Sequence, residues 1–245
     1  MTYRPMLFNT PMVCAIEDGT KTQTRRLVQL PKNKDWELLD VHPNPDLPGR
    51  FWQAEINGTL TDVKKRFTLG IKAPCVPGDV LWVRETWMPG HFDKPKSAVP
   101  VDWKELGFFY YARDEVKNSD GTPVPWRPSI HMPKEAARIF LRVDEVRAER
   151  LHKSFFRYGD IVLTIAAEGI DVGVQCRECI DTYGCPCCID SESECGVLDD
   201  IRDDFARLWD STIKPAALPR FGWASNPWVW VIKFTRTERP EGWGR

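Results

Sequence analysis

The sequence lacks long apolar runs and an excess of charge of either sign. No run of 18 apolar residues is present, and no positively charged segment followed by an apolar one opens the chain. We therefore expect a soluble protein without a signal peptide, located in the cytoplasm. The formal net charge of -1 argues against a protein that coats duplex nucleic acid through a basic surface. It leaves room for a small basic pocket.

The chain is long enough to bury one sizeable core. With 245 residues, a single domain carrying insertions is the simplest organisation. The sequence pattern predicts five or six strands with helices between them and no regular alternation of strand and helix. This favours an α+β fold with a curled sheet. We also expect a hairpin around Asn57-Gly58, a helix that ends at Glu168 before Gly169, a helix with an apolar face from Ile201 to Trp209, and a frayed tail beyond Arg236.

The segment Asp18–Arg26 concentrates hydroxyl and cationic side chains directly after a predicted helix. Thr10 can cap this helix, and Gly19 can end it. The residues from Lys21 to Val28 are rich in Thr and Val, which is typical of a strand. The segment is either a functional site or a solvated edge strand with basic side chains, and composition alone favours neither.

The pattern Gly19-x-Lys21-Thr22-x-Thr24-x-Arg26 resembles the signature of the ASCH family, a branch of the PUA-like β-barrels. The chain is similar to the long form of that family found in phage and prophage genomes. The resemblance implies a PUA-like (ASCH) β-barrel with flanking helices as a single domain over residues 1–245, with insertions at about 29–74, 88–125 and 171–197. Three later segments agree with it in order: Pro77–Glu85, Trp126–Pro133 and Asn226–Val231.

The resemblance also implies a catalytic group. In small bacterial ASCH proteins that hydrolyse N4-acetylcytidine, a Lys, a Thr and a Glu carry the reaction. The motif places the first two at Lys21 and Thr24, and the position of the Glu on a helix places it at Glu168. Amide cleavage needs a nucleophile, a base and a proton donor for the leaving nitrogen, and these residue types can supply all three.

Each of the three residues needs a particular environment. A Lys acts as a base only if burial or neighbouring cations lower its pKa, and Arg25 and Arg26 are close enough in sequence to contribute. A helix C-terminus favours the protonated form of Glu168, which suits a proton donor. Lys21 and Thr24 would face opposite sides of a regular strand, so they converge only if Lys21 belongs to the turn or the strand is bulged.

Further residues are predicted to bind the substrate. Arg26 can bind a carbonyl oxygen or a phosphate, and Trp126 can stack on a base while His131 donates to it. Alternatively Trp126 belongs to the core and His131 is a buried imidazole with its hydrogen bonds satisfied. The predicted substrate-binding residues are Arg26, Arg84, Trp126, Arg127 and His131.

Six of the eight cysteines lie between residues 176 and 195. Without a secretion signal, disulfides are the less favoured use, and a CxxC pair among further cysteines is typical of a structural Zn²⁺ site. A metal would also stabilise a segment that has few apolar residues. Free thiols or a redox pair are the alternative. We predict the ligands Cys176, Cys179, Cys188 and Cys195, with Cys185 and Cys187 as alternates.

These features lead to one main functional hypothesis and three alternatives. We expect a protein, encoded by a phage and acting in the host cytoplasm, that binds a nucleobase, a nucleoside or RNA, and that hydrolyses N4-acylated cytidine. The first alternative is a module that binds single-stranded RNA or modified DNA without chemistry. The second is a ribonuclease, and the third is a phage structural or host-interaction factor. No partner in a membrane is expected.

Overall fold

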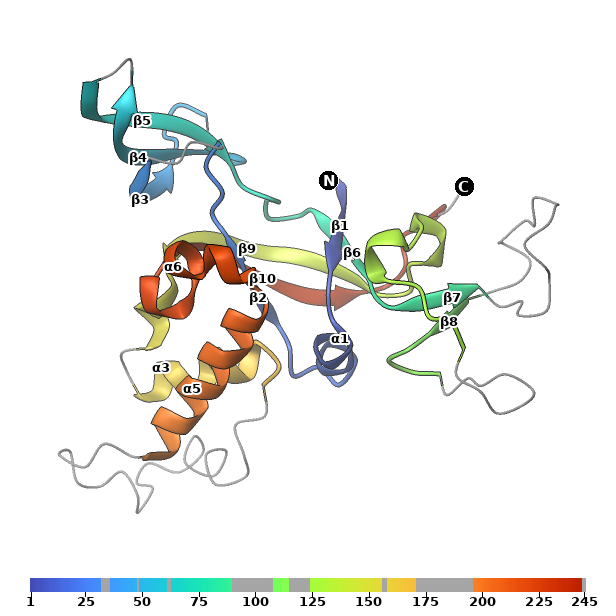
Figure 1. Ribbon diagram of the computed structural model, residues 1–245. Coiled ribbons are helices and arrows are strands. Elements are labelled where there is room, and N and C mark those ends of the chain that lie inside the picture. The colour runs from blue at the N-terminus through green and yellow to red at the C-terminus, as the bar shows by residue number, and fades with distance from the viewer. Residues whose placement is uncertain are drawn as a thin grey trace. The chain divides into compact units, whose positions relative to one another are not determined.

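The computed structural model describes residues 1–31, 36–47, 49–60, 63–89, 108–114, 124–155, 158–170 and 196–243 (Figure 1). These residues form a mixed α+β fold made mostly of strands, so the predicted class is confirmed. The chain divides into two compact units, each built from separate stretches of sequence. Unit 1 comprises Met1–Thr20, Gly78–Val143 and Phe234–Arg245, and unit 2 comprises Lys21–Pro77 and Asp144–Lys233.

Five strands are hydrogen-bonded in the order β1-β6-β9-β10-β2. Over the described ranges this order is open and does not close into a barrel. The two long strands β9 (Phe140–Arg150) and β10 (Trp228–Thr237) each have residues in both units. None of the described helices is long and apolar enough to cross a membrane.

Unit 1 is built on a parallel pair of strands. β1 (Tyr3–Leu7) runs parallel to β6 (Val80–Arg84), with Tyr3 opposite Val80, and β6 pairs antiparallel with the start of β9. The other elements of this unit are α1 (Thr10–Glu17), β7 (Trp87–Pro89), β8 (Phe108–Tyr110) and two 3-10 turns, Ser129–His131 and Lys134–Ala136.

The helix α1 ends at the predicted position, but its N-cap lies one residue before the predicted one. The cap is Asn9, whose side chain accepts a hydrogen bond from the backbone N–H of Met12 at 3.0 Å, and not the predicted Thr10. Asn is a somewhat better cap than Thr, which explains the difference of one residue. Gly19 has φ +78° and stops the helix, since few other residues adopt that conformation readily.

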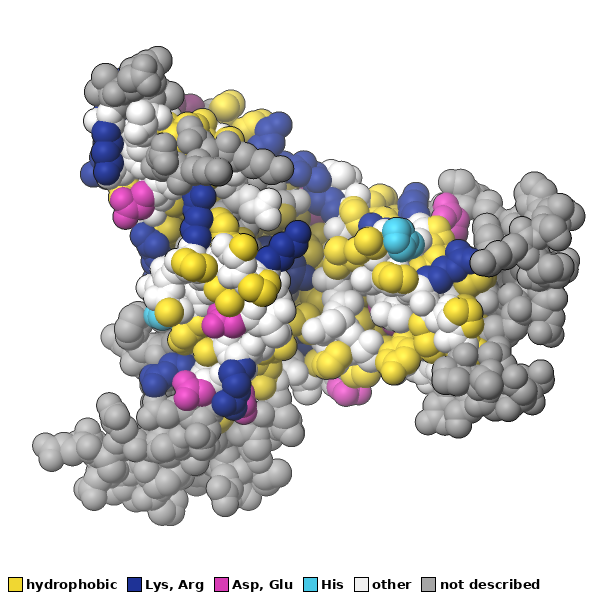
Figure 2. All heavy atoms as spheres, viewed as in Figure 1, with side chains coloured by type: hydrophobic (Ala, Val, Ile, Leu, Met, Phe, Trp, Pro, Cys, Tyr) yellow, Lys and Arg dark blue, Asp and Glu magenta, His cyan; other side chains and the backbone are white. Residues whose placement is uncertain are grey.

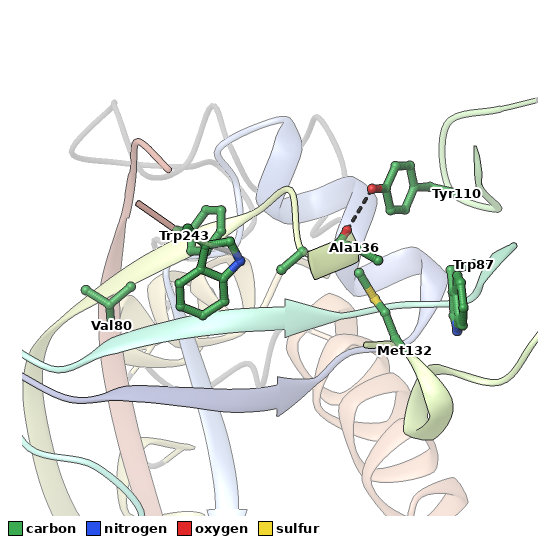
Figure 3. Packing of buried hydrophobic residues seen from close by; sticks show 8 residues of the cluster. Val80, Trp87, Tyr110, Met132, Ala136 and Trp243 are labelled. Atoms are coloured by element: carbon green, nitrogen blue, oxygen red, sulfur yellow. Dashed lines mark hydrogen bonds between the residues drawn. The ribbon is translucent and has the colours of Figure 1, made fainter. Parts of the chain in front are cut away.

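The core of unit 1 includes a residue from the C-terminal tail, so the predicted fraying beyond Arg236 is wrong. Trp243 is 8% exposed, and its indole N–H donates to the carbonyl of Lys134 at 2.9 Å. Its ring meets that of Phe140 edge to face, with centroids 5.0 Å apart. Figure 3 shows part of this core, whose members are Val80, Trp87, Tyr110, Met132, Ala136, Ala137, Phe140 and Trp243.

Unit 2 packs two helices against the strands β2 and β10. β2 (Gln23–Leu27) pairs antiparallel with β10, and α3 (Tyr158–Ala167) and α5 (Gly196–Ser211) lie side by side (Figure 1). The predicted apolar face of α5 is confirmed, because Ile201, Phe205 and Trp209 enter this core. The short elements of the unit are α6 (Leu218–Phe221) and the 3-10 turns Leu151–Phe155, Pro215–Ala217 and Trp223–Ser225.

A three-stranded antiparallel sheet completes unit 2, and the predicted turn lies elsewhere than expected. Its strands are β3 (Glu37–Pro43), β4 (Phe51–Leu60) and β5 (Val63–Lys72). Asn57 pairs with Arg66, so the Asn57-Gly58 pair lies inside the ladder and the chain reverses after Leu60. The alternation of buried Trp52, Ala54 and Ile56 continues through Gly58, and this pattern outweighs the local turn signal.

The position of Trp243 predicts that the C-terminal tail stabilises unit 1. Trp243→Ala removes a buried ring and its hydrogen bond, and we expect a loss of about 3–5 kcal/mol in the free energy of unfolding. Urea denaturation followed by circular dichroism measures this. Trp126→Ala is the matched control, because that ring is only half-buried and should cost much less. Equal losses in the two variants would contradict the assignment.

Candidate functional site

The end of α3 fixes the position of Glu168. The backbone N–H of Ile170 donates to the carbonyl of Ile165 at 3.3 Å, and that of Gly169 donates to Ala166 at 2.8 Å. This is the Schellman ending of a helix, and it needs a left-handed residue such as Gly169, with φ +79°. Glu168 is therefore the capping residue, held in the interior of unit 2, as the sequence predicted.

The start of β2 supplies donors to the exposed carbonyls of α3. The last carbonyls of a helix have no partner within it and must be satisfied from elsewhere. Three consecutive residues, two before β2 and the first residue of β2, do this, and one of the donors is an ammonium, which the negative end of the helix dipole favours. The hydrogen bonds are Lys21 Nζ to the carbonyl of Glu168 (2.7 Å), Thr22 N–H to Ala167 (2.9 Å) and Gln23 Nε2 to Thr164 (3.1 Å).

Lys21 and Glu168, 147 positions apart, form a buried ion pair. Nζ of Lys21 lies 3.0 Å from Oε2 of Glu168, and the two residues are 2% and 6% exposed. β2 begins at Gln23, so Lys21 belongs to the approach to the strand and not to the strand itself. This was one of the two ways in which the sequence allowed its side chain to turn inward.

Arg25 binds the other oxygen of Glu168 and links it to Glu149. Its Nη1 lies 2.6 Å from Oε1 of Glu168, and its Nη2 lies 3.4 Å from Oε1 of Glu149 on β9. Both oxygens of Glu168 thus accept hydrogen bonds from cations. That is the hydrogen-bonding pattern of a carboxylate, whereas the helix-dipole argument predicted a proton donor at this position.

The ion pairs continue outward from the buried cluster. Nε of Arg147 lies 3.1 Å from Oε2 of Glu149, and its Nη1 lies 3.1 Å from Glu145, which also meets Lys233 at 3.2 Å. Opposite charges therefore alternate from the interior to exposed positions. Such an arrangement stabilises each buried charge with a partner, which is the condition for keeping charges inside a protein.

Thr24 lies on the opposite face of β2 from Arg25. Its hydroxyl accepts a hydrogen bond from Nη1 of Arg26 at 2.8 Å, because residues two apart in a strand share a face. Thr24 is 1% exposed. Among the described residues, its hydroxyl bonds to neither Lys21 nor Glu168. The structure thus brings the predicted amine and carboxylate together, and it places the predicted nucleophile beside Arg26.

Burial changes the ionisation of the cations. Loss of hydration lowers the pKa of Lys21 below its ordinary value of 10.5, Glu168 acts in the opposite direction, and Arg26 and Arg25 lower it further. Burial also lowers the pKa of Arg26, against the attraction of Glu168. The pKa of Lys21 is thus shifted in the direction that a lysine base requires, through burial and through neighbouring cations.

The other predicted substrate-binding residues belong to unit 1. The guanidinium of Arg84 lies over the ring of Trp82 and donates to the carbonyl of Ile130. Trp126 is half-buried, edge to face with Tyr111. Arg127 is exposed, with its guanidinium over the ring of Trp87. His131 is also exposed, so it is not a buried imidazole.

The cysteine cluster lies outside the described residues. All six predicted or alternate zinc ligands fall within 171–195, which the structure does not describe. In the part of the chain that it does describe, no group of His, Cys, Asp or Glu has the arrangement of a metal site, and neither Cys14 nor Cys75 forms a disulfide.

Two members of the buried cluster were not predicted to be site residues. Arg25 was expected only to lower the pKa of Lys21, and Glu149 was not singled out. A signal for Glu149 was present: Glu145, Arg147 and Glu149 alternate along one face of a strand, after the apolar Leu141 and Val143 on the same face. Charges of alternating sign at this spacing indicate a ladder of ion pairs across a sheet.

Comparison with known proteins adds no relative. No protein-family model matches the chain, and neither a curated protein nor a solved structure does.

The lowered pKa of Lys21 predicts a pH dependence of stability. Below its folded pKa the cost of burying the ammonium is complete. Between that pKa and 10.5 the unfolded chain holds more protons than the folded one, so the free energy of unfolding rises with pH, and above 10.5 the cost is gone. In Lys21→Met this contribution is absent. Urea denaturation at a series of pH values up to 10.5 should show a shallower rise in the variant.

The control for this measurement is Lys65→Met, which changes an exposed lysine of the same unit. Its stability should follow that of the wild type at every pH. If Lys21→Met also follows the wild type throughout, the lowered pKa of Lys21 is refuted.

Proposed function

We propose that this chain is an ASCH protein with a PUA-like fold, that it binds a nucleobase or nucleoside at the buried cluster of unit 2, and that it hydrolyses N4-acylated cytidine. One observation carries this proposal. The ammonium of Lys21 and the carboxylate of Glu168, which the ASCH resemblance paired across 147 positions, lie 3.0 Å apart in the interior. Neither composition nor periodicity gives a reason for these two residues to meet.

The residues support an amide hydrolysis with Thr24 as the nucleophile. Water adds across the bond between the acyl carbon and N4, giving cytidine and a carboxylic acid. As the neutral amine that its lowered pKa favours, Lys21 takes the proton of the Thr24 hydroxyl as that oxygen attacks the acyl carbon, and it gives the proton to the departing N4, which leaves the acyl group on Thr24. Water then attacks this ester, with Lys21 again transferring the proton, and releases the carboxylic acid and the free Thr24 hydroxyl. Glu168 holds the amine in place through its side chain and its carbonyl. Arg26 binds the acyl oxygen, on which negative charge develops.

Binding without chemistry is the second candidate, and the position of Thr24 favours it. The Thr24 hydroxyl bonds to Arg26 at 2.8 Å, and Lys21 already donates to two oxygens of Glu168. Hydrolysis with Thr24 as nucleophile requires Lys21 to exchange one of these hydrogen bonds for the Thr24 hydroxyl when substrate binds. A module that only reads a base requires no such exchange.

Hydrolysis of N4-acetylcytidine tests the proposal and separates the two candidates. We expect the wild type to release cytidine, detected by chromatography. Lys21→Met and Thr24→Val should each lower the rate by about a hundredfold or more, because each removes a proton-transfer partner or nucleophile. Thr24→Ser retains the hydroxyl and should retain activity, and Lys65→Ala is the matched control for loss of a lysine.

Three other outcomes would change the proposal. Binding of the nucleoside by calorimetry without turnover would replace the enzyme by a binding module. Turnover that is unchanged in Lys21→Met would place the chemistry elsewhere. Neither binding nor turnover would remove the nucleoside site.

We further propose that the cysteine cluster holds a structural Zn²⁺ through Cys176, Cys179, Cys188 and Cys195, as its spacing predicts. Emission spectrometry should find about one zinc per chain. The double variant Cys176→Ser/Cys179→Ser should lose the metal. Cys14→Ser, which removes a free thiol, should keep it. Metal-free wild-type protein purified without chelators would refute the assignment.

A further inference from the structure

A cavity in unit 2 begins where β2 ends. It has a volume of about 530 Å³, within the range of small-molecule sites. Leu27 and Val28 form part of its wall, and the N–H of Val28 continues the strand pairing by donating to Trp228 at 3.0 Å. Val28 follows Thr24 and Arg26 at the two-residue spacing of a strand, so all three share a face. Leu27 lies on the face of Arg25, so both faces of β2 reach the cavity where the strand ends.

Two arginines in the cavity wall are stacked on aromatic rings. The guanidinium of Arg150 lies 5.2 Å from the ring centre of Trp228, and that of Arg220 lies 5.2 Å from that of Phe221. A third ring, Trp36, also lines the space. Aromatic faces and guanidinium planes are the surfaces on which nucleobases stack.

Both arginines keep their charge available for a ligand. Arg150 donates to the carbonyls of Asn226 and Leu38 at 3.2 and 3.3 Å, and Arg220 donates to that of Trp36 at 2.9 Å. Carbonyl partners fix the orientation of a guanidinium without neutralising it. Over the described ranges, neither arginine has a carboxylate partner.

The wall of the cavity also contains one carboxylate, and the net charge of the wall remains positive. Among the described residues of the wall, Glu37 is the single acidic side chain, against two arginines. A cavity with a net positive charge and aromatic walls favours a planar ligand that carries an anion. The carboxylate of Glu37 can accept a hydrogen bond from an exocyclic amine of such a ligand.

We infer that this cavity binds a nucleotide, with the base against the aromatic walls and the phosphate at Arg220 and Arg150. The inference goes beyond the proposed function, because it concerns a second site with its own ligand. The nucleotide is either free or one unit of a single-stranded RNA, and the same chemistry recognises both.

Binding of cytidine 5′-monophosphate, cytidine and a fluorescein-labelled oligocytidine tests the inference. We expect the monophosphate to bind more tightly than cytidine, measured by calorimetry. Arg220→Ala should weaken the monophosphate by about tenfold, which is the value of one charge-assisted hydrogen bond to phosphate. It should affect cytidine little. Phe221→Leu should weaken both ligands, since it removes a stacking surface while keeping an apolar side chain.

The matched control is Arg207→Ala. Arg207 is an exposed arginine of α5 in the same unit and does not line this cavity. Its removal changes the net charge by the same amount and should leave binding unchanged. Arg220→Lys is the second variant: it keeps the charge and should recover part of the affinity even if Arg220→Ala loosens the local fold.

The oligocytidine distinguishes the two sources of the nucleotide. If the ligand is a strand, the oligomer binds more tightly than the monophosphate, and Arg220→Ala reduces the salt slope of its affinity by about 0.7, the value for one phosphate contact on a single strand. If the ligand is a free nucleotide, the oligomer has no advantage. Either result supports the cavity as a nucleotide site.

Three results would overturn the inference. The first is no binding of either phosphate-bearing ligand by the wild type. The second is equal affinity in the wild type, Arg220→Ala and Phe221→Leu. The third is displacement of the oligomer by polyglutamate of equal charge at equal concentration, which would mean that charge alone is recognised. Because cytosine is unmodified in all three ligands, failure to hydrolyse N4-acetylcytidine leaves this test intact, and Lys21→Met should retain monophosphate binding.

Discussion

The interior of unit 2 depends on one capped helix end. The Schellman turn at Gly169 directs the last carbonyls of α3 toward the start of β2, and Lys21 completes both the helix end and the charge of Glu168. A single ammonium thus satisfies a backbone carbonyl and a buried carboxylate. Burial of ions costs several kcal/mol each unless they are paired and hydrogen-bonded, so each further partner in this cluster is required by the one before it. The charge of Glu168 is paired with Arg25, and that of Arg25 with Glu149. The series of ion pairs ends at Glu145 and Lys233, which are accessible to water.

A role in capping the helix and a role as a base place different demands on Lys21. The burial that lowers the pKa of Lys21 is what a general base needs, yet the two hydrogen bonds to Glu168 make Lys21 a structural cap. A lysine that only capped the helix would function equally well with an ordinary pKa near the surface, where the dipole interaction costs no desolvation. Its complete burial beside two arginines lowers stability without adding to the cap. Sites that bind or transform ligands commonly carry such a cost.

Local signals in the sequence predicted the helix and the strand that form this site. They did not predict which distant residues meet. The pair Glu168-Gly169 marked the helix end, and the spacing of Ile201, Phe205 and Trp209 marked the apolar face that packs near it. No periodicity joins Lys21 to Glu168, and that expectation came from the ASCH resemblance alone. Local rules failed where packing decided the outcome. Asn57-Gly58 stayed in a ladder because the apolar face of β4 continues past it, and Trp243 filled the core of unit 1 although its neighbours in sequence are polar.

The alternation of a strand explains why unit 2 can present two different environments so close in sequence. On β2, Arg25 reaches Glu168 while Thr24 and Arg26 share the other face. On β9, Glu149 joins the buried ion pairs while the next residue, Arg150, stacks on Trp228 in the cavity wall. Successive residues point to opposite faces, so neighbouring residues of one strand can serve the ion pairs and a different set of contacts. Of the arginines named here, Arg150 lines the cavity, together with Arg220 of α6. The strands therefore separate the charges that hold the fold together from the cations that remain available to a ligand.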